Sequence, residues 1–155
     1  MFSRPRWSVY NQAMSEKCIF CEILASRAEA SFVYRDEVVA AFMDIRPVNA
    51  GHVLVIPVQH AASLAELDEG DGRQMFSVAQ RVTAALRKSG MPCEGVNLFL
   101  ADGRAAGQEV WHVHLHVFPR FAGDGHHMRF SPAYFMPHTR DEMEATAGKI
   151  RAVFV

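Results

Sequence analysis

Three histidines stand at alternate positions of one short segment of this 155-residue chain, which reads EVWHVHLHVFPR over residues 109–120. Side chains two positions apart share a face of a β-strand and lie roughly 7 Å from each other. His112, His114 and His116 are therefore predicted to form a row on one face of a strand. The aliphatic residues between them point to the opposite face, where they can anchor the strand in the core and make the row rigid: Val113, Leu115 and Val117.

Three interpretations of this row compete. A sheet face whose histidines only meet solvent suits a single histidine, and three in strict register argue against it. Alternate histidines can also share one metal ion. In the third interpretation the middle imidazole is a nucleophile, and its neighbours handle charge and protons. The segment DGRAAGQ, directly before the row, favours the third, because Gly103 and Gly107 let backbone N–H groups approach an anion such as a phosphate.

The rest of the chain predicts an α+β domain whose single antiparallel sheet has about five strands and is covered by helices on one side. The apolar patterns predict a short helix in CIFCEILAS, a hairpin of two β runs at 32–34 and 38–42, and strands in HVLVIP and GVNLFLA. Capping-box patterns at 63–66 and 139–142 predict helix starts, and a longer helix follows the first of them. The final helix is expected to bury four apolar side chains: Met143, Ala147, Ile150 and Phe154.

Composition and charge exclude several classes of protein. A formal net charge of −1 provides no basic field for binding nucleic acid. No apolar run reaches the roughly 18 to 20 residues that span a bilayer, and the N-terminus lacks the apolar centre of a secretory signal. A reduced, cytoplasmic setting is expected. Residues 1–14 are interpreted as an N-terminal extension, and residues 15–155 as a single domain with a variable C-terminal tail and helix.

Several segments together resemble the histidine triad (HIT) family of nucleotide hydrolases and transferases, in its bacterial-type hydrolase branch. The family motif alternates three histidines with apolar residues, and HVHLHVF fits it at every position. The resemblance also covers CIFCEI, AFMDIRPVNAGHVLVIPVQH, GVNLF and AAGQEVWHVHLHVFPR, from Cys18 to about Arg120. It implies a HIT-like five-stranded antiparallel sheet with helices packed on it. It also implies a homodimer with the long helix and a strand edge at the interface.

The resemblance implies a mechanism as well. His114 would attack the α-phosphorus of a nucleotide and form a covalent nucleotidyl-histidine, which water then hydrolyses. His112 and His116 would stabilise the phosphate oxygens or hold the middle ring in the right tautomer. His52 is similar to the fourth active-site histidine of the family. No catalytic metal is required for this chemistry.

The segment FMDIRPVNAGH is similar to the nucleoside pocket of the family, in which Asp44 would accept hydrogen bonds from the ribose hydroxyls. The residues implied to sandwich the base also fit a plain core: Ile19, Phe20, Phe42 and Ile45. Support of the triad or contact with the phosphate is implied for four further residues: Asn97, Gly107, Gln108 and Glu109.

The chain departs from one branch of the family at two positions near the phosphate. Ala101 stands where that branch has Asn, and Glu109 stands where it has Ser. A carboxylate close to a phosphate is unfavourable unless it points away or is paired. Glu109 is therefore expected to shift the preference among leaving groups or to act only through its backbone N–H. The third histidine is His116 and not Gln, which favours a hydrolase over a uridylyl transferase.

Cys18 and Cys21 have the spacing of a zinc knuckle, but two thiolates supply only half of a tetrahedral site. Some bacterial-type HIT proteins complete the site with two histidines, which correspond here to His60 and His112. This similarity implies a structural Zn²⁺ that ties the N-terminal helix to the sheet. The alternative is a pair of packed, inert thiols on a helix.

These observations predict a nucleotide hydrolase with a purine nucleotide or nucleotide conjugate as substrate. It would cleave a phosphoramidate or phosphoanhydride bond at the α-phosphorus of a nucleoside 5′-phosphate derivative, through a covalent nucleotidyl-histidine intermediate. Two alternatives stay open. One is a dinucleoside polyphosphate hydrolase, which differs in the leaving group, and the other is a nucleotide-binding module with negligible turnover.

Overall fold

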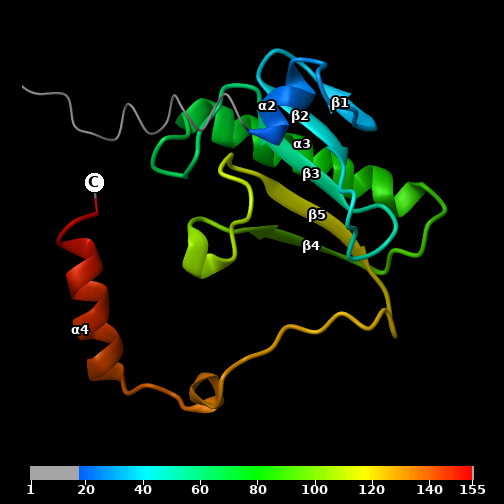
Figure 1. Ribbon diagram of the computed structural model, residues 1–155. Helices are drawn as coiled ribbons and strands as arrows, with labels where there is room; N and C mark the ends of the chain where they lie inside the picture. Colours follow the sequence, from blue (N-terminus) through cyan, green and yellow to red (C-terminus); the bar gives the residue numbers. More distant parts are fainter. Residues whose placement is uncertain (1–17, 155) are drawn as a thin grey trace, which may run out of the picture. The chain divides into compact units, whose positions relative to one another are not determined.

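The computed structural model describes residues 18–154 (Figure 1). Its elements, in chain order, are α2 (Ile19–Leu24), β1 (Phe32–Arg35), β2 (Val39–Met43), β3 (Val53–Pro57), α3 (Glu69–Lys88), β4 (Gly95–Leu100), η1 (Arg104–Ala106), β5 (Leu115–Arg120), η2 (Pro132–Phe135) and α4 (Arg140–Arg151). The chain divides into two compact units, one ending at Asp124 and one beginning at Gly125. The predicted extension 1–14 lies outside the described residues, and a single domain over 15–155 stays a prediction.

The first unit is built on a five-stranded sheet with the order β1-β2-β3-β5-β4, in which every neighbouring pair is antiparallel. The predicted α+β class and the five antiparallel strands are confirmed. The hairpin corner between β1 and β2 is fixed by Asp36, whose Oδ1 accepts the N–H groups of Val38 and Val39 at 2.8 and 2.6 Å. Asp is favoured in turns because its side chain bonds to the backbone a few residues on.

The two central strands β2 and β3 are buried on both faces, which explains why they read as continuous apolar runs, VAAFM and VLVIP. Helix α3 packs on one face through apolar residues that include Met75, Val78 and Val82. The short helix α2 packs on the other face through Phe20 and Ile23. The expectation of helices on one side only is therefore wrong, because α2 covers part of the second face.

Residues 63–66 form turns instead of the predicted helix. Helix α3 begins at Glu69, because the carboxylate of Asp68 accepts two backbone N–H groups of its first turn, at 2.7 and 3.2 Å. The carboxylate of Glu66 accepts the N–H of Ala62, 3.1 Å away, outside any helix.

Strand β5 begins at Leu115, later than predicted, so the first two histidines of the row precede it. The ladder between β3 and β5 is short, and β3 ends at Pro57, which has no N–H to extend it. The N–H of Val113 donates instead to the carbonyl of Ala61, 2.7 Å away. The segment before β5 is therefore held by the chain that follows β3.

The second unit contains η2 and α4. The predicted capping box of α4 is confirmed: the side chain of Thr139 accepts the N–H of Glu142, and the carboxylate of Glu142 accepts the N–H of Thr139. The apolar side chains expected to face a core are exposed or only partly buried, so that expectation is wrong: Met143, Ala147, Ile150 and Phe154. Within residues 18–154, no helix combines the length and apolar character needed to cross a bilayer.

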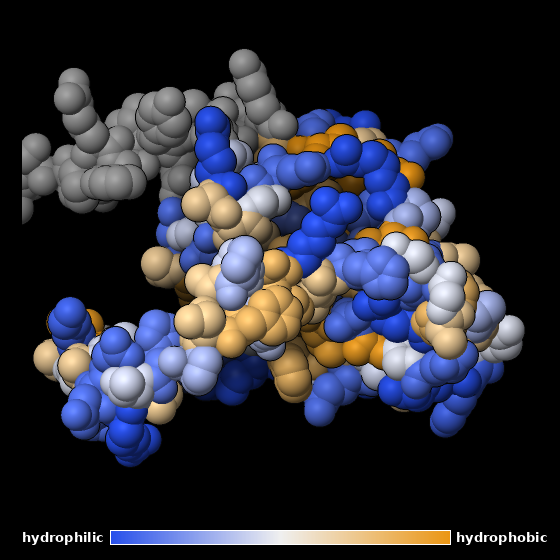
Figure 2. All heavy atoms as spheres, turned by 90° about the horizontal axis from the view of Figure 1, so that it is seen from below, coloured by the Kyte–Doolittle hydropathy of each residue, from blue (hydrophilic) through white to orange (hydrophobic). Residues whose placement is uncertain are grey.

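Strand β4 forms one edge of the sheet and keeps Leu98 and Phe99 exposed. Figure 2 shows a face on which hydrophilic residues (blue) and apolar residues (orange) are both exposed. The homodimer with the long helix and a strand edge at its interface stays a prediction.

Candidate functional site

The three histidines of the row are close neighbours with different surroundings. The rings of His114 and His116 have centroids 4.8 Å apart. Phe20 of α2 places its ring edge-on to both His112 and His114, with centroid distances of 5.8 and 5.3 Å. His112 is completely buried and His114 nearly so, whereas the His116 side chain is 20% exposed.

His114 is held by the main chain. Its Nδ1 lies 2.7 Å from the carbonyl oxygen of His112. A carbonyl can only accept, so Nδ1 carries the hydrogen and Nε2 keeps its lone pair. This is the tautomer that a nucleophile needs, and His114 borders a large cavity of about 1300 Å³.

His116 and His52 form a hydrogen-bonded chain with a defined direction. The N–H of Val48 donates to His52 Nδ1 at 3.1 Å, and His52 Nε2 lies 2.9 Å from His116 Nδ1. Since His52 Nδ1 accepts, the hydrogen of His52 is on Nε2, and it is donated to His116. The hydrogen of His116 is consequently on Nε2, which leaves that atom as a donor for another group.

Burial keeps this chain neutral. Desolvation, together with the nearby His114 and His52, lowers the pKa of His116 to about 4, although Asp44 and Glu109 act in the opposite direction. Burial also lowers the pKa of His52, against the attraction of Asp44. Neutral rings at pH 7 are what the hydrogen-bond directions require.

Asp44 lies beside this pair, with Oδ2 at 3.7 Å from His52 Nε2 and 3.8 Å from His116 Nδ1. These three groups are close enough to hold a metal ion. The hydrogen on His52 Nε2 argues against a metal there, because a ligating nitrogen must present a lone pair. The geometry around His116 therefore does not favour a metal site.

The other end of the row does suit a metal. The ligand atoms of Cys18, Cys21, His60 and His112 all lie within 4.8 Å of one another. Cys21 Sγ is 3.3 Å from His60 Nδ1 and 3.7 Å from His112 Nδ1, and the two Nδ1 atoms are 3.3 Å apart. Two thiols and two imidazoles form a donor set typical of a closed tetrahedral zinc site.

The tautomer and the thiol chemistry support this assignment. His112 Nε2 lies 2.8 Å from the carbonyl oxygen of Pro57, so Nε2 carries the hydrogen and Nδ1 directs its lone pair at the thiols. Burial, followed by the neighbouring Cys18, raises the pKa of Cys21 to about 12. Thiolates in such a place need a cation beside them. The ring of His112 therefore belongs to this cluster, and the hydrogen bond of His112 to His114 comes from its backbone carbonyl.

The cavity in front of His114 and His116 contains most of the predicted nucleotide-binding residues. Its lining includes Ile19, Phe20, Phe42, Asp44, Ile45, His52, Gly107 and Glu109. Phe20 and Phe42 meet edge to face with centroids 5.5 Å apart and form an apolar wall. Ile45 is 92% exposed, so it lies at the surface and not in the core. Asp44 Oδ1 accepts the N–H of Arg46 at 2.8 Å, which fixes the carboxylate at the cavity wall.

Two of the predicted nucleotide-binding residues, Gln108 and Asn97, are not among those that line the cavity. The side-chain amide of Gln108 donates to the carbonyls of Ala62 and Val110 at 2.8 and 3.1 Å, and its backbone N–H donates to Gly103. Gln108 therefore braces the loop with its side-chain amide, and its contact with a phosphate stays a prediction. The side-chain oxygen of Asn97 accepts from Arg120 at 2.6 Å, so Asn97 supports the end of β5 and not the histidines.

The lining residues that sequence reasoning missed include Phe32, Arg46, Phe99 and Val110. Phe99 lies opposite His116 in the β4–β5 register, with ring centroids 5.8 Å apart, so the strand pairing could have indicated it. The guanidinium of Arg46 pairs with the carboxylate of Glu109 at 2.5 Å. In the sequence, only the position of Arg46 two residues after Asp44 indicated that it could line the cavity.

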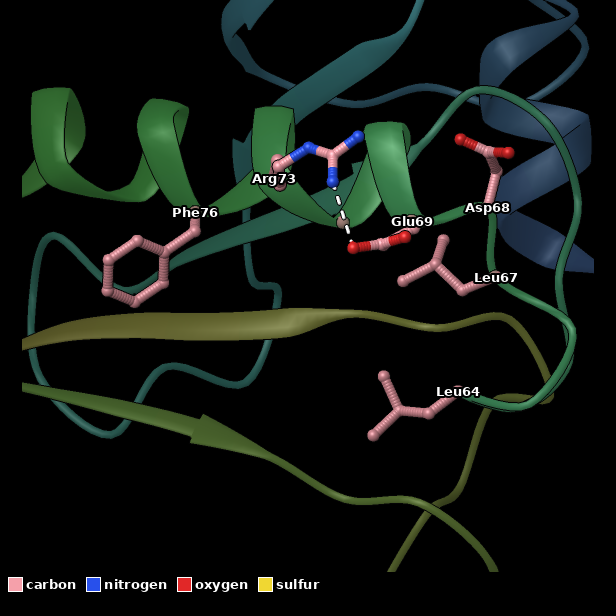
Figure 3. A pocket seen from close by; sticks show the side chains of 7 residues that line it. Leu64, Leu67, Asp68, Glu69, Arg73 and Phe76 are labelled. Atoms are coloured by element: carbon pink, nitrogen blue, oxygen red, sulfur yellow. Dashed lines mark hydrogen bonds and ion pairs between the residues drawn. The ribbon is translucent and has the colours of Figure 1, made fainter. Parts of the chain in front are cut away.

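A second hollow, with a volume of about 550 Å³, lies at the start of α3 (Figure 3). Its lining combines apolar side chains such as Leu64, Leu67 and Phe76 with the ion pair of Arg73 and Glu69 at 2.9 Å. It is lined by no histidine or cysteine of the described residues, so it offers no comparable chemistry.

Comparison with known proteins agrees with this geometry. A family model described as "HIT domain" matches residues 25–123, and the chain belongs to the HIT family. A crystal structure of a HIT family protein from Bacillus anthracis is 33% identical, with a TM-score of 0.81 over 90% of this chain and 99% of that one.

Two further solved structures are similar to this chain. A Zn-bound histidine triad family protein from Mycobacterium smegmatis is 37% identical, with a TM-score of 0.70 over 89% of this chain and 98% of that one. A histidine triad nucleotide-binding protein from Candida albicans is 27% identical, with a TM-score of 0.77 over 87% and 95% of the two chains.

Proposed function

We propose that this protein is a nucleotide hydrolase that cleaves a phosphoramidate or phosphoanhydride bond at the α-phosphorus of a purine nucleoside 5′-phosphate derivative. One observation carries the proposal: His114 is oriented by the His112 carbonyl so that the lone pair of Nε2 is available beside a large cavity. Membership of the HIT family and the nucleotide-binding relative from Candida albicans support a nucleotide as the ligand.

In the proposed reaction His114 Nε2 attacks the α-phosphorus, and the bond to the leaving group breaks with its electron pair on that group. The N–H of His116 Nε2 donates to the phosphate oxygens or to the departing atom. Water then attacks the phosphorus of the nucleotidyl-histidine, and the bond to Nε2 breaks. The proton that the water releases replaces the one that the leaving group takes when it departs. The products are a nucleoside monophosphate and the free leaving group, and the ring returns to its starting tautomer.

The nucleotide is proposed to lie with its base against the wall formed by Ile19, Phe20 and Phe42, under the exposed Ile45. Asp44 accepts from the ribose hydroxyls, because its carboxylate is fixed at the cavity wall by the N–H of Arg46. Gly107 and Glu109 also line the cavity, and the phosphate is proposed to lie beside them.

We also propose that Cys18, Cys21, His60 and His112 hold a structural Zn²⁺. The donor set, the lone pair of His112 Nδ1 and the Zn-bound relative from Mycobacterium smegmatis support this assignment. A metal bound here cross-links α2 to the segment before β5. The proposed chemistry at His114 does not use it.

The test is covalent capture on His114. Wild-type protein is incubated with an adenosine 5′-phosphoramidate and with a diadenosine polyphosphate, quenched without acid, and analysed by peptide mass spectrometry. We expect an adenylyl adduct on His114, and a loss of turnover of at least about a thousandfold in His114→Ala. His127→Ala, which removes an exposed histidine of the second unit, is the matched control and should retain activity.

The outcomes separate the alternatives. Faster turnover of the phosphoramidate supports the proposal, and faster turnover of the polyphosphate supports a dinucleoside polyphosphate hydrolase. If nucleotides bind but neither substrate is consumed and no adduct forms, the protein is a binding module and the proposed enzyme function is wrong.

A further inference from the structure

Glu109 stands at the mouth of the cavity. It follows Gln108, whose side chain is locked to Ala62, Val110 and Gly103, so the position of the backbone at 109 is fixed. Its own side chain is 70% exposed. Glu109 lines the same cavity as His114 and His116, and its charge acts on the His116 ring. A carboxylate is therefore present in the same cavity as His114 and His116.

The partner of Glu109 comes from a different segment of the chain. Arg46 follows Asp44 on the segment between β2 and β3, and its guanidinium pairs with the Glu109 carboxylate at 2.5 Å. Both side chains are largely exposed, at 77% and 70%. An exposed pair of this kind contributes little to stability and opens readily. A charged group on a substrate can therefore replace either partner.

The charge balance of the cavity indicates which partner is replaced. Three carboxylates line it, those of Glu29, Asp44 and Glu109, and Arg46 is the only lysine or arginine among the described lining residues. Apart from the histidines, the lining carries two net negative charges. A site built for a polyphosphate leaving group needs positive charge, because like charges at close range disfavour binding. A leaving group with an ammonium suits this lining better.

We propose that Glu109 selects substrates by the charge of their leaving group, favouring nucleoside 5′-phosphoramidates whose amine carries a second, cationic ammonium and disfavouring anionic leaving groups. The ammonium takes the place of the Arg46 guanidinium on the Glu109 carboxylate. The inference rests on the proposed hydrolysis at His114 and adds the class of leaving group.

The experiment uses three adenosine 5′-phosphoramidates that share the same P–N bond. Their amines are 1,3-diaminopropane, butylamine and β-alanine, so the distal group is cationic, neutral or anionic at pH 7. The value of kcat/KM is measured for each with wild type, Glu109→Gln, Arg46→Gln and the double variant. Each substrate is compared across variants, which removes differences in the basicity of the amines.

We expect wild type to prefer the cationic over the anionic substrate, and Glu109→Gln to reduce that ratio about three- to tenfold. Arg46→Gln should increase the ratio, because it removes the cation that competes for Glu109. The double variant should behave like Glu109→Gln. Added salt should reduce the wild-type ratio and leave that of Glu109→Gln almost unchanged.

Several results would overturn the inference. A cationic-to-anionic ratio that is the same in wild type and Glu109→Gln shows that Glu109 does not select by charge. An equal fall for all three substrates assigns Glu109 a general role in binding or folding instead. If folded wild-type protein hydrolyses none of the three, the proposed function fails together with the inference, whereas an unchanged ratio with normal turnover defeats the inference alone.

Discussion

His112 and His116 lie at the two ends of one short segment, yet their rings differ in which nitrogen carries the hydrogen and which presents a lone pair. His112 donates from Nε2 to the Pro57 carbonyl and directs the lone pair of Nδ1 at Cys18 and Cys21. His116 accepts at Nδ1 from His52 and keeps its hydrogen on Nε2. The first ring can bind a metal and the second can donate to a phosphate. The partner of one ring nitrogen thus decides what the other can do.

Burial acts on both rings in the same way, so it does not explain the difference. Desolvation lowers the pKa of each to about 4. What differs is the neighbouring chemistry: thiols at one end, and a carboxylate and a second imidazole at the other. His114 lies between the two ends and depends on both, through the His112 carbonyl and through contact with the His116 ring.

The largest effect is expected when a thiol is removed from the cluster around His112. Cys21→Ser should abolish stoichiometric zinc binding and lower the free energy of unfolding by about 3–5 kcal/mol, since loss of a structural metal is among the most damaging single changes. Zinc content by atomic emission and urea denaturation measure the two effects. Cys93→Ser is the matched control, because Cys93 is a free thiol outside the cluster. Equal stability and zinc content in Cys21→Ser and wild type would refute the metal assignment.

An intermediate effect is expected when the hydrogen-bond partner of His116 is replaced. His52→Leu removes the donor that fixes the tautomer of His116, and kcat should fall about 10- to 100-fold with little change in KM. His52→Gln retains an N–H donor and should restore part of the activity. Zinc content should stay at the wild-type value in both variants. A loss of zinc in His52→Leu would show that the two ends are not independent.

The smallest effect is the dependence of stability on pH. The pKa of His116 falls from its ordinary 6.5 to about 4 on folding, so between these values the unfolded chain binds a proton that the folded chain excludes. The free energy of unfolding should therefore decrease as the pH falls from about 6.5 to about 4, with His116 contributing about 1–2 kcal/mol given its partial exposure.

Replacing His116 isolates its share of this dependence. Urea denaturation across that pH range should give a flatter curve for His116→Gln than for wild type. All other titrating groups are common to the two proteins. Identical slopes would contradict a depressed pKa at His116.

The sequence predicted the strands and the family, because alternating and continuous apolar patterns report burial directly. It placed Cys18, Cys21, His60 and His112 together only by resemblance, and their geometry agrees. It could not predict ring directions, which depend on carbonyls and N–H groups distant in the chain, such as those of Pro57 and Val48. The partners of Gln108 and Asn97 could not be predicted for the same reason. A polar side chain can hydrogen-bond either to the backbone or to a ligand, and which of the two it does depends on how the loop packs.

One consequence follows from the way His114 is held. Its Nδ1 is hydrogen-bonded to the backbone carbonyl oxygen of residue 112, which is present whatever the side chain at that position. If the His112 ring holds the proposed zinc, His114 depends on residue 112 only through the position of this peptide group. In the proposed mechanism, the side chain of the first histidine of the motif would therefore serve the structure, and those of the second and third would serve the reaction.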